Sequence, residues 1–212
     1  MIETREQWLK ERLNGIGASE AASIVNLSPY KSNLELWEEK TGRRVAEDIG
    51  DKPYVKFGTE AEKHIRALFA LDNPQYQVGY EEFKIIRNAD HPFLFATLDG
   101  WLTEDNGRMG VWECKTTEIL RANQWENWNS RIPDNYYIQV LHQLLATGYD
   151  FAILTARIKY TDRNGNKKAV TQSYTIERSL VLNDLDYLLK EEIKFWERVK
   201  NDRRPNLMLP DI

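Results

Sequence analysis

The chain has 212 residues, of which 42% are hydrophobic and 29% are charged, a composition typical of a folded protein and not of a disordered one. Its single cysteine, Cys114, excludes an internal disulfide framework and any four-cysteine zinc or iron–sulfur site. The formal net charge of −4 does not by itself indicate a nucleic-acid partner, although a local basic patch can oppose the net charge.

The N-terminus is charged and amphipathic, and it lacks the apolar run of a signal peptide. No stretch approaches the ~18 consecutive apolar residues of a membrane span. We therefore expect a cytoplasmic protein without a membrane partner. A chain of this length fits one domain, so residues 1–212 are expected to form a single domain.

The N-terminal third of the chain is predicted to be mainly helical. Apolar residues at helical spacing predict helices over residues 3–13, 20–25, 34–42 and 60–71. Ser19 occupies the N-cap position of the second of these helices. The segment Leu27–Tyr30 is predicted to be a turn, and the polar residues 43–55 a loop.

From residue 78 the apolar pattern changes to the alternation of strands. Strands are predicted over residues 78–87, 93–102, 111–116, 151–160 and 169–178. Helices are predicted over residues 118–131, 136–147 and 183–201. Asn106-Gly107 and Asn164–Asn166 are strong signals for hairpin turns. This mixture predicts an α/β fold, with a central mixed β-sheet and helices on both faces.

Residues capable of chemistry are concentrated in two predicted strands, FLFATLDGWL and GVWECKTT. Alternation places Glu113 and Lys115 on one face, and a hairpin about Asn106-Gly107 puts Asp99 nearly opposite Glu113, with roughly 5 Å between their Cβ atoms. Two such carboxylates repel each other unless a cation lies between them, and Mg²⁺ prefers these oxygen ligands. The alternative is an exposed cross-strand Glu–Lys ion pair, which is common.

On the metal-site interpretation, the backbone carbonyl of Cys114 supplies a further oxygen, and Lys115 orients or deprotonates the attacking water. The Cys114 thiol is not expected to be a nucleophile, since no paired histidine is apparent. His142 lies one turn from Gln139 and either lines the cleft or occupies a plain helix position. Trp125 and Trp128 either pack in the core, stack on unpaired bases or form a subunit interface.

The order Asp99, then Glu113-Cys114-Lys115, resembles the (D/E)xK core of restriction-endonuclease-like nucleases. A wider set of segments is more specific, because it follows the order seen in the phage lambda exonuclease-like family of viral recombination nucleases, also called alkaline exonucleases. These segments are Trp8–Arg12, Gly15–Glu20, Leu27–Tyr30, Phe57–Glu62, Leu98–Gly100 and Tyr137–Val140. The resemblance spans roughly residues 5 to 147 and implies the restriction-endonuclease-like fold in a single nuclease domain.

The resemblance implies a catalytic function for five residues. Asp99, Glu113 and Glu62 would bind metal together with the Cys114 carbonyl, and Lys115 would serve the nucleophilic water. Gln139 matches a glutamine that lies beside the site in the family. The expected cofactor is Mg²⁺, with two ions per site, and Mn²⁺ is expected to substitute for it.

Arg12, Ser19 and Thr97 fall where the family forms a pocket for the 5′-phosphate of a DNA end, and Thr97 stands where a serine is usual. A serine hydroxyl at a helix N-terminus lies beside free backbone N–H groups, which favour a phosphate, and Arg12 adds a bidentate donor. The alternative is that Ser19 only caps its helix and Arg12 pairs with Glu20.

The function implied is stepwise 5′→3′ hydrolysis of one strand at the ends of linear double-stranded DNA, with release of 5′-mononucleotides. A homotrimeric ring would encircle the DNA, and the remaining 3′ single strand would suit a single-strand annealing protein in phage-type homologous recombination. The host would be a bacterial cell carrying the gene on a phage or prophage. Two alternatives are an endonuclease of the same fold, which would cut closed circles, and a DNA-end-binding module without hydrolysis.

Overall fold

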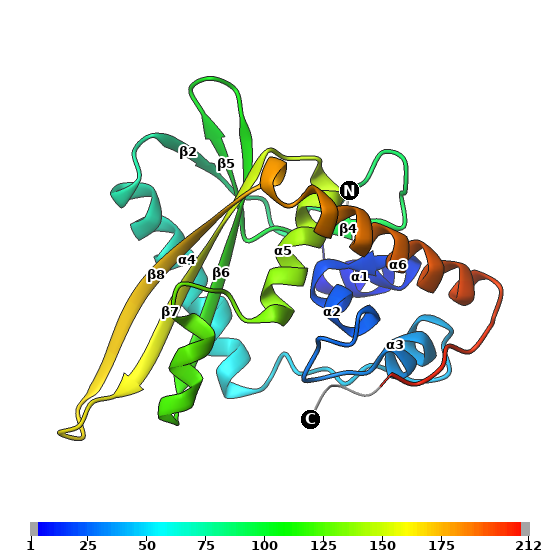
Figure 1. Cartoon of the computed structure of the whole chain (residues 1–212), viewed down its shortest axis with the longest axis horizontal. Helices are drawn as coiled ribbons and strands as arrows, with labels where there is room; N and C mark the ends of the chain where they lie inside the picture. The colour runs from blue at the N-terminus through cyan, green and yellow to red at the C-terminus, as the bar shows by residue number, and fades with distance from the viewer. Residues whose placement is uncertain (1–3, 209–212) are drawn as a thin grey trace.

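The computed structural model of the chain describes residues 4–208, which form two β-sheets and the helices around them (Figure 1). The larger sheet has the strand order β2-β5-β6-β7-β8, in which β6 and β7 run parallel and the other neighbouring pairs antiparallel. Its strands are β2 (Tyr76–Gly79), β5 (Gly100–Glu104), β6 (Met109–Ile119), β7 (Phe151–Thr161) and β8 (Lys167–Glu177). The smaller sheet, with the order β1-β4-β3, contains β1 (Ile16–Gly17), β4 (Leu94–Ala96) and β3 (Ile86–Arg87).

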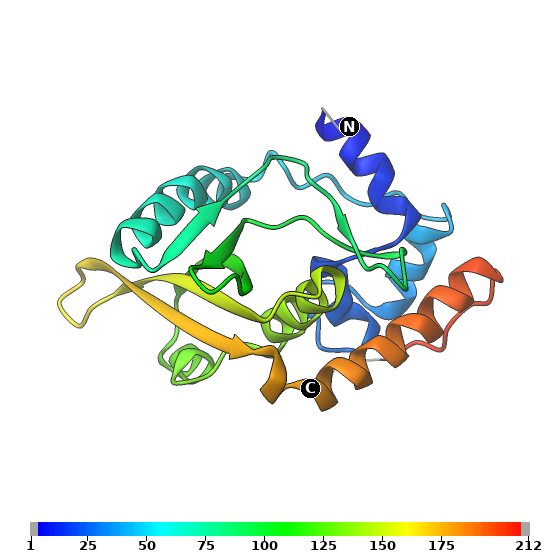
Figure 2. The ribbon, with the colours of Figure 1, turned by 90° about the horizontal axis from the view of Figure 1, so that it is seen from above.

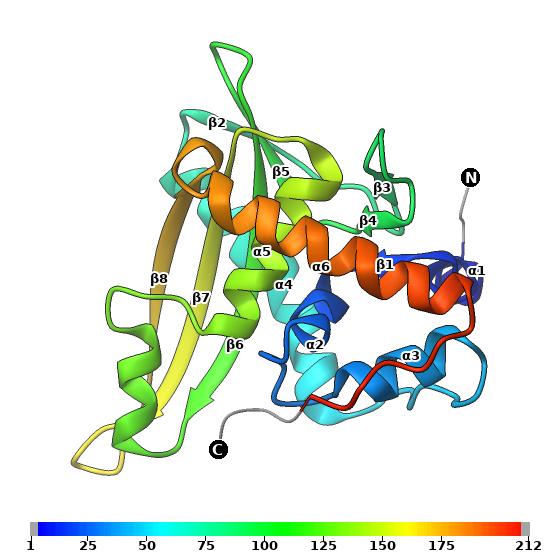
Figure 3. The same ribbon diagram turned by 45° about the vertical axis from the view of Figure 1, so that its right-hand side comes forward.

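Helices cover both faces of the larger sheet, and further helices gather beside it around the smaller sheet (Figures 2 and 3). They are α1 (Arg5–Glu11), α2 (Ala21–Ile24), α3 (Asn33–Lys40), α4 (Pro53–Asp72), α5 (Asp134–Thr147) and α6 (Leu182–Lys200). On one face, Phe69 of α4 packs against Trp112 of β6. This arrangement confirms the predicted mixed α/β fold. Within residues 4–208, no helix is long and apolar enough to cross a membrane.

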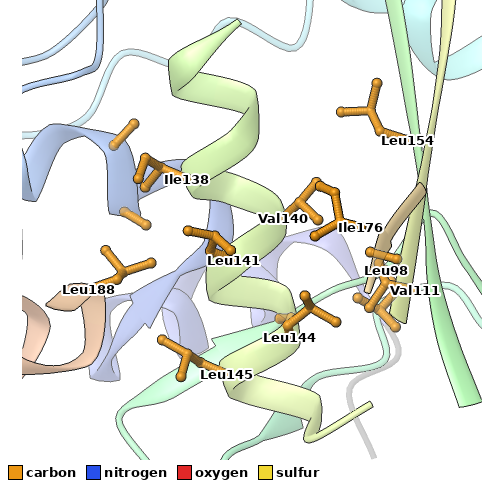
Figure 4. Packing of buried hydrophobic residues seen from close by; sticks show 14 of the residues in the cluster. Leu98, Val111, Ile138, Val140, Leu141, Leu144, Leu145, Leu154, Ile176 and Leu188 are labelled. Atoms are coloured by element: carbon orange, nitrogen blue, oxygen red, sulfur yellow. The ribbon is translucent and has the colours of Figure 1, made fainter. Parts of the chain in front are cut away.

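Helix α5 is buried between the other face of the larger sheet and α6. Figure 4 shows Val140 and Leu144 turned toward Ile176 and Val111 of the sheet, while Leu188 of α6 lies on the opposite side of the helix. Close packing of this kind leaves little freedom of movement. The polar side chains of α5 therefore have fixed positions relative to β6.

Two predicted helices differ from the observed ones. Helix α4 begins at Pro53, inside the predicted loop, because proline at the first helical position is already set for a helix. Gly58, which appeared to precede the helix, lies within it, where a Cβ atom would be 3.4 Å from Thr116 Oγ1 of β6. Residues 122–128 form the 3-10 helix η3 (Ala122–Trp128), and not the longer helix predicted over 118–131. Residue 3 of the first predicted helix lies outside the described residues.

The two long strands predicted over 78–87 and 93–102 are each divided between the sheets. The first separates into β2 and β3, and Phe83 between them has a φ of 58°, which is incompatible with a strand. The second separates into β4 and β5, since β4 pairs with β1 and β3 while β5 pairs with β2 and β6. The chain therefore crosses from one sheet to the other immediately before β5, and Asp99 lies in this crossing.

Candidate active site

Strands β5 and β6 separate at the position of Asp99. The last pair of their ladder is Gly100–Trp112, and beyond it β6 continues with only β7 as a neighbouring strand in the described sheet. On the free edge of β6, the backbone N–H of Cys114 donates a hydrogen bond of 2.9 Å to Asp99 Oδ2. The expected position of Asp99 opposite Glu113 continues the register of this ladder by one residue.

Glu113 is 2% exposed, and its carboxylate is held by three side chains. Lys115 Nζ and Gln139 Nε2 each lie 2.7 Å from Oε1, and Gln143 Nε2 donates to Oε2. Lys115 also donates to Gln139 Oε1 at 2.9 Å. Gln139 and Gln143 are four residues apart on α5, so they project from the same face of that helix toward β6.

Glu62 reaches the same place from α4. Arg66, one turn later on this helix, lies 2.9 Å from Glu62 Oε1 and donates to the backbone carbonyl of Asp99 at 2.5 Å. The Arg66 guanidinium also lies over the ring of Tyr80, with its Cζ 3.7 Å from the ring centroid. The structure thus gathers Glu62, Asp99 and Glu113 with Arg66 and Lys115, and we call these five residues the acidic cluster.

The acidic cluster has three carboxylates and two cationic side chains, and this imbalance changes its pKa values. Burial raises the pKa of Asp99 well above its ordinary value, and the charges of Glu113 and Glu62 raise it further. Burial also raises the pKa of Glu62, although Arg66 opposes the rise. Burial lowers the pKa of Lys115, but Glu113 and Asp99 raise it by more, so this lysine is held in its charged form.

The donors of the acidic cluster fit a divalent cation that prefers oxygen. Within residues 4–208, no group of three or more His, Cys, Asp or Glu side chains could hold a metal ion in the positions described. Mg²⁺, however, usually binds through one or two carboxylates and completes its shell with water and substrate phosphate. The N–H and C=O groups of a strand residue point to the same side, so the Cys114 carbonyl faces the free edge beside Asp99. A bound cation would relieve the excess negative charge.

A second group of polar side chains connects Arg12, Ser19 and Thr97, the three residues predicted to bind a phosphate. Arg12 Nη2 donates to Ser19 Oγ at 3.1 Å, and the Arg12 guanidinium lies over the Trp8 ring, with its Cζ 4.7 Å from the ring centroid. Trp8 Nε1 donates to Thr97 Oγ1 at 2.9 Å. Arg12 also lies 3.7 Å from Glu20, which is the ion pair considered for it from the sequence.

Ser19 does not occupy the N-cap position predicted for it. It lies inside the 3-10 helix η2 (Ala18–Glu20), whose N-cap is Gly17. The Glu20 carboxylate accepts the hydrogen bond of the Gly17 N–H at 2.8 Å, which satisfies that backbone donor. The helix-terminus argument for a phosphate therefore does not apply here. The Ser19 hydroxyl instead accepts from the side chain of Arg12.

Lys40 of α3 forms an ion pair with Glu20, as Arg12 does. We call Arg12, Glu20 and Lys40 together the basic cluster. The Lys40 side chain is 1% exposed, and its Nζ donates to Glu20 Oε1 at 2.9 Å and to the Arg12 carbonyl at 2.8 Å. Burial lowers the pKa of Lys40, while Glu20 partly restores it. Two cations and one carboxylate leave the basic cluster with a positive excess.

Comparison with known proteins places the chain in a family. The family model of the YqaJ-like viral recombinase domain matches residues 7–150 of the chain. The chain belongs to this family. It is 31% identical to the uncharacterized protein YqaJ of Bacillus subtilis (strain 168) over 206 residues, which are 96% of this chain and 59% of that protein. It is 25% identical to the uncharacterized protein R354 of Acanthamoeba polyphaga mimivirus over 153 residues, which are 68% of this chain and 27% of that protein.

The fold is shared with solved exonucleases. The alkaline exonuclease LHK-Exo of Laribacter hongkongensis superposes with a TM-score of 0.66 at 18% identity, covering 93% of this chain and 94% of that one. A phage related exonuclease of Haemophilus somnus superposes with a TM-score of 0.58 at 11% identity, covering 89% and 96%. These similarities confirm the predicted mixed α/β fold, which the chain shares with the alkaline exonuclease. The chain spans 59% of the length of the Bacillus relative and 27% of the mimivirus relative.

Of the alternatives that the sequence left open, His142 occupies a plain helix position and Trp128 packs in the core. His142 is fully buried, with Nδ1 2.6 Å from Glu192 Oε1 of α6 and Nε2 2.9 Å from the carbonyl of Phe95. Trp128 is 4% exposed and packs against Tyr136, while Trp125 is partly buried. Trp128 is a member of the main hydrophobic cluster, and Trp125 packs against it.

The sequence reasoning missed Arg66, Gln143 and Lys40. The signal for the first two was available, because each lies four residues after a predicted site residue, Glu62 and Gln139, on the same helix. Lys40 gave no such signal. Its nearest site partner is Glu20, twenty residues away, and only the packing of α3 against the N-terminal segment brings the two together.

Proposed function

We propose that this chain is a magnesium-dependent DNA exonuclease that acts on the ends of linear double-stranded DNA. The observation that supports this most strongly is the presence of two clusters with opposite excess charge: the acidic cluster suits a divalent cation, and the basic cluster suits a phosphate. A DNA end brings a terminal phosphate and, one nucleotide further, a phosphodiester. The mononucleotide in the LHK-Exo complex with dAMP is compatible with such a substrate.

The carboxylates of the acidic cluster, Lys115 and the residues beside them have distinct functions in this proposal. Asp99, Glu113 and the Cys114 carbonyl would hold Mg²⁺, with Glu62 contributing from α4, and two ions per site are expected, with Mn²⁺ able to substitute. The bound cation would supply Lewis acidity and lower the pKa of water. Gln139 and Gln143 fix the direction of the Glu113 carboxylate. Lys115, held beside Glu113, would orient or deprotonate the attacking water and offset charge on the phosphate.

The reaction conserves all atoms of the phosphodiester and one water. The water oxygen forms a bond to phosphorus, and the bond from phosphorus to the 3′ oxygen of the terminal nucleotide breaks. That oxygen takes up a proton, and the products are a 5′-mononucleotide and a DNA strand with a new 5′-phosphate. Arg12, Ser19 and Thr97 would bind the original terminal phosphate, which sets the length of the product to one nucleotide.

The direction of digestion and the assembly are part of the proposal and are supported by family membership. We expect 5′→3′ polarity, a homotrimeric ring around the DNA, and 3′ single strands that a single-strand annealing protein uses in phage-type recombination. A ring would explain how a chain of net charge −4 remains on DNA, since a closed topology does not depend on electrostatic affinity. The bacterial cytoplasm is the compartment in which this activity would operate.

Digestion of a 5′-phosphorylated linear duplex with Mg²⁺, beside a covalently closed circle and an EDTA control, tests the proposed function. Loss of the linear duplex with release of 5′-mononucleotides, and an intact circle, is the expected result. Cleavage of the circle would instead indicate an endonuclease of this fold. A protein that binds the ends and leaves every substrate intact would be an end-binding module.

A further inference from the structure

Tyr30 is an aromatic residue on the surface of the molecule, and hydrogen bonds hold its backbone in place. Its side chain is 79% exposed. The backbone around it is fixed, because the Ser28 hydroxyl accepts hydrogen bonds from the N–H groups of Tyr30 at 3.2 Å and of Lys31 at 3.3 Å. Lys31 in turn forms an ion pair with Glu39, whose side chain is buried. An exposed ring on a fixed backbone loses little conformational entropy when it binds a ligand.

The position of Tyr30 connects it to the acidic cluster. Its phenol neighbours that of Tyr136 on α5, and the ring of Tyr136 faces Lys115, with Nζ 4.9 Å from the ring centroid. Burial raises the pKa of Tyr136 to about 12, and Tyr30 contributes to the rise, so Tyr136 remains a neutral phenol. Lys115, Tyr136 and Tyr30 therefore form a path of neighbouring side chains from the acidic cluster to the surface.

A DNA strand cut at the acidic cluster presents bases as well as phosphates. When a phosphate lies at Lys115, the attached nucleoside extends away from the buried carboxylates toward solvent, where the exposed ring lies. At least the base of the departing nucleotide must leave its partner strand. Unpaired bases stack on aromatic side chains regardless of sequence, because every base has a π-face.

We propose that Tyr30 is a stacking platform for an unpaired base of the strand being cut, next to the phosphate held at Lys115. This inference rests on the proposed function and adds a base-binding subsite to it. Trp125 and Trp128, the residues considered for stacking from the sequence, are packed against Tyr160 and Tyr136. Tyr30 offers the free ring face that they lack.

The test compares variants of the full chain on linear duplexes that lack one base. Abasic sites are placed singly at successive positions from the 5′ end, and kcat/KM is measured for the wild type, Tyr30→Ala, Tyr30→Phe and Tyr187→Ala. Tyr187 is a matched control, since it is 56% exposed on α6 and does not belong to the path to Lys115. We expect Tyr30→Ala to lower kcat/KM about tenfold and Tyr30→Phe and Tyr187→Ala to change it little.

The abasic series identifies the partner of the ring. At the position that stacks, loss of the base should slow the wild type about as much as Tyr30→Ala does, and should not slow Tyr30→Ala further. Such non-additivity is the signature of two groups that contact each other. Additive effects at every position would overturn the proposal, and they would also be the result if the substitution only disturbed Tyr136. A changed mass of Tyr30→Ala in solution would instead place Tyr30 between two copies of the chain.

A binding measurement separates this inference from the proposed function. A duplex with 2-aminopurine near its 5′ end is mixed with the protein in EDTA, and stacking on Tyr30 should quench the fluorescence in the wild type and not in Tyr30→Ala. Quenching without cleavage in Mg²⁺ would contradict the exonuclease and leave the subsite standing. Cleavage with equal fluorescence in both proteins would contradict the subsite alone. No binding of the duplex would overturn both.

Discussion

The acidic cluster and the basic cluster are both built from partly or fully buried, hydrogen-bonded charges, but their unbalanced charges have opposite signs. The acidic cluster combines Glu62, Asp99 and Glu113 with two cations, and the basic cluster combines Arg12, Glu20 and Lys40. In the first, burial and like charges raise the pKa of Asp99. In the second, burial lowers the pKa of Lys40, and Arg12 lowers it further.

A third buried group, the pair of His142 and Glu192, shows what a balanced cluster looks like. Both side chains are fully buried, and one proton shared between them leaves no net charge. Both ring nitrogens of His142 face acceptors, Glu192 Oε1 and the Phe95 carbonyl, so the charges balance within the pair, although Glu192 Oε2 has no hydrogen-bond partner among residues 4–208. The comparison of this pair with the two clusters shows that burial of charged side chains does not by itself indicate a binding site. A buried group in which charges of one sign outnumber the other indicates a site for an ion of the opposite sign.

The largest expected effect is that of Glu113→Gln, which removes the negative excess. Cleavage of linear duplex DNA should fall by at least about 10³-fold, since the cation and Lys115 both lose their partner. The temperature of thermal unfolding and the affinity for DNA ends should stay close to those of the wild type. Glu118→Gln, an exposed glutamate on the same strand, is the matched control and should leave the rate unchanged. Full activity of Glu113→Gln would exclude a catalytic function of the acidic cluster.

The balanced pair is expected to affect stability. Replacing His142 with Ala leaves the Glu192 carboxylate buried without its partner, and the free energy of unfolding should fall by about 3 kcal/mol. Burial lowers the pKa of His142, but Glu192 and Phe95 raise it by more, to above the ordinary value of 6.5. The stabilisation is therefore complete below about pH 6.5 and is lost as the pH rises through the folded pKa. Denaturant titrations between pH 5 and pH 9 measure this; the same pH dependence in both proteins would refute the charged pair.

Arg66 sharpens the comparison, because it separates the position of the carboxylates from their excess charge. Arg66→Met increases the negative excess, which favours a cation, but it also removes the donor to Glu62 and to the Asp99 carbonyl, and we expect this loss of position to have the larger effect. We expect the affinity for Mn²⁺ to fall by about 10- to 100-fold, as is usual when a residue that orients a metal ligand is lost. Arg66→Lys should restore part of the affinity. If calorimetry gives equal affinities for all three proteins, Arg66 does not position the carboxylates.

The smallest effect is expected in the basic cluster. Arg12→Ala should reduce the preference for 5′-phosphorylated over 5′-hydroxyl ends by about tenfold, since one charge-assisted hydrogen bond is lost. Arg43→Ala is the control, because Arg43 also lies over a tryptophan, Trp37 at 4.6 Å, and pairs with Asp202 on the surface. Rates on the two kinds of end decide the question. A preference that survives in Arg12→Ala would place the phosphate pocket elsewhere.

The sequence was most informative where one strand or hairpin determines the geometry. Alternation along β6 and the Asn106-Gly107 turn were sufficient to place Glu113, Lys115 and Asp99 together. The sequence was least informative where separate elements meet. The break between β4 and β5 depends on the pairing of β4 with β1, which lies far away in the sequence, and no local signal predicts it.

The same limit explains what the sequence predicted wrongly, or left open, at single residues. Ser19 had the local signature of an N-cap, but Glu20 satisfies the Gly17 N–H first. His142 lies one turn from Gln139, yet the packing of α6 on α5 encloses it with Glu192. The exposure of Tyr30 and its proximity to Lys115 through Tyr136 depend on how the loop before α3 meets α5, which spacing along the chain does not contain.

The central claim is that the acidic cluster attracts a divalent cation because it carries one carboxylate in excess. Titration of Mn²⁺ into the full chain, followed by the electron paramagnetic resonance signal of the free ion, tests this most directly. The account predicts saturable binding that is lost in Asp99→Asn and kept in Glu118→Gln. Equal binding of Mn²⁺ by the wild type and by Asp99→Asn would contradict it.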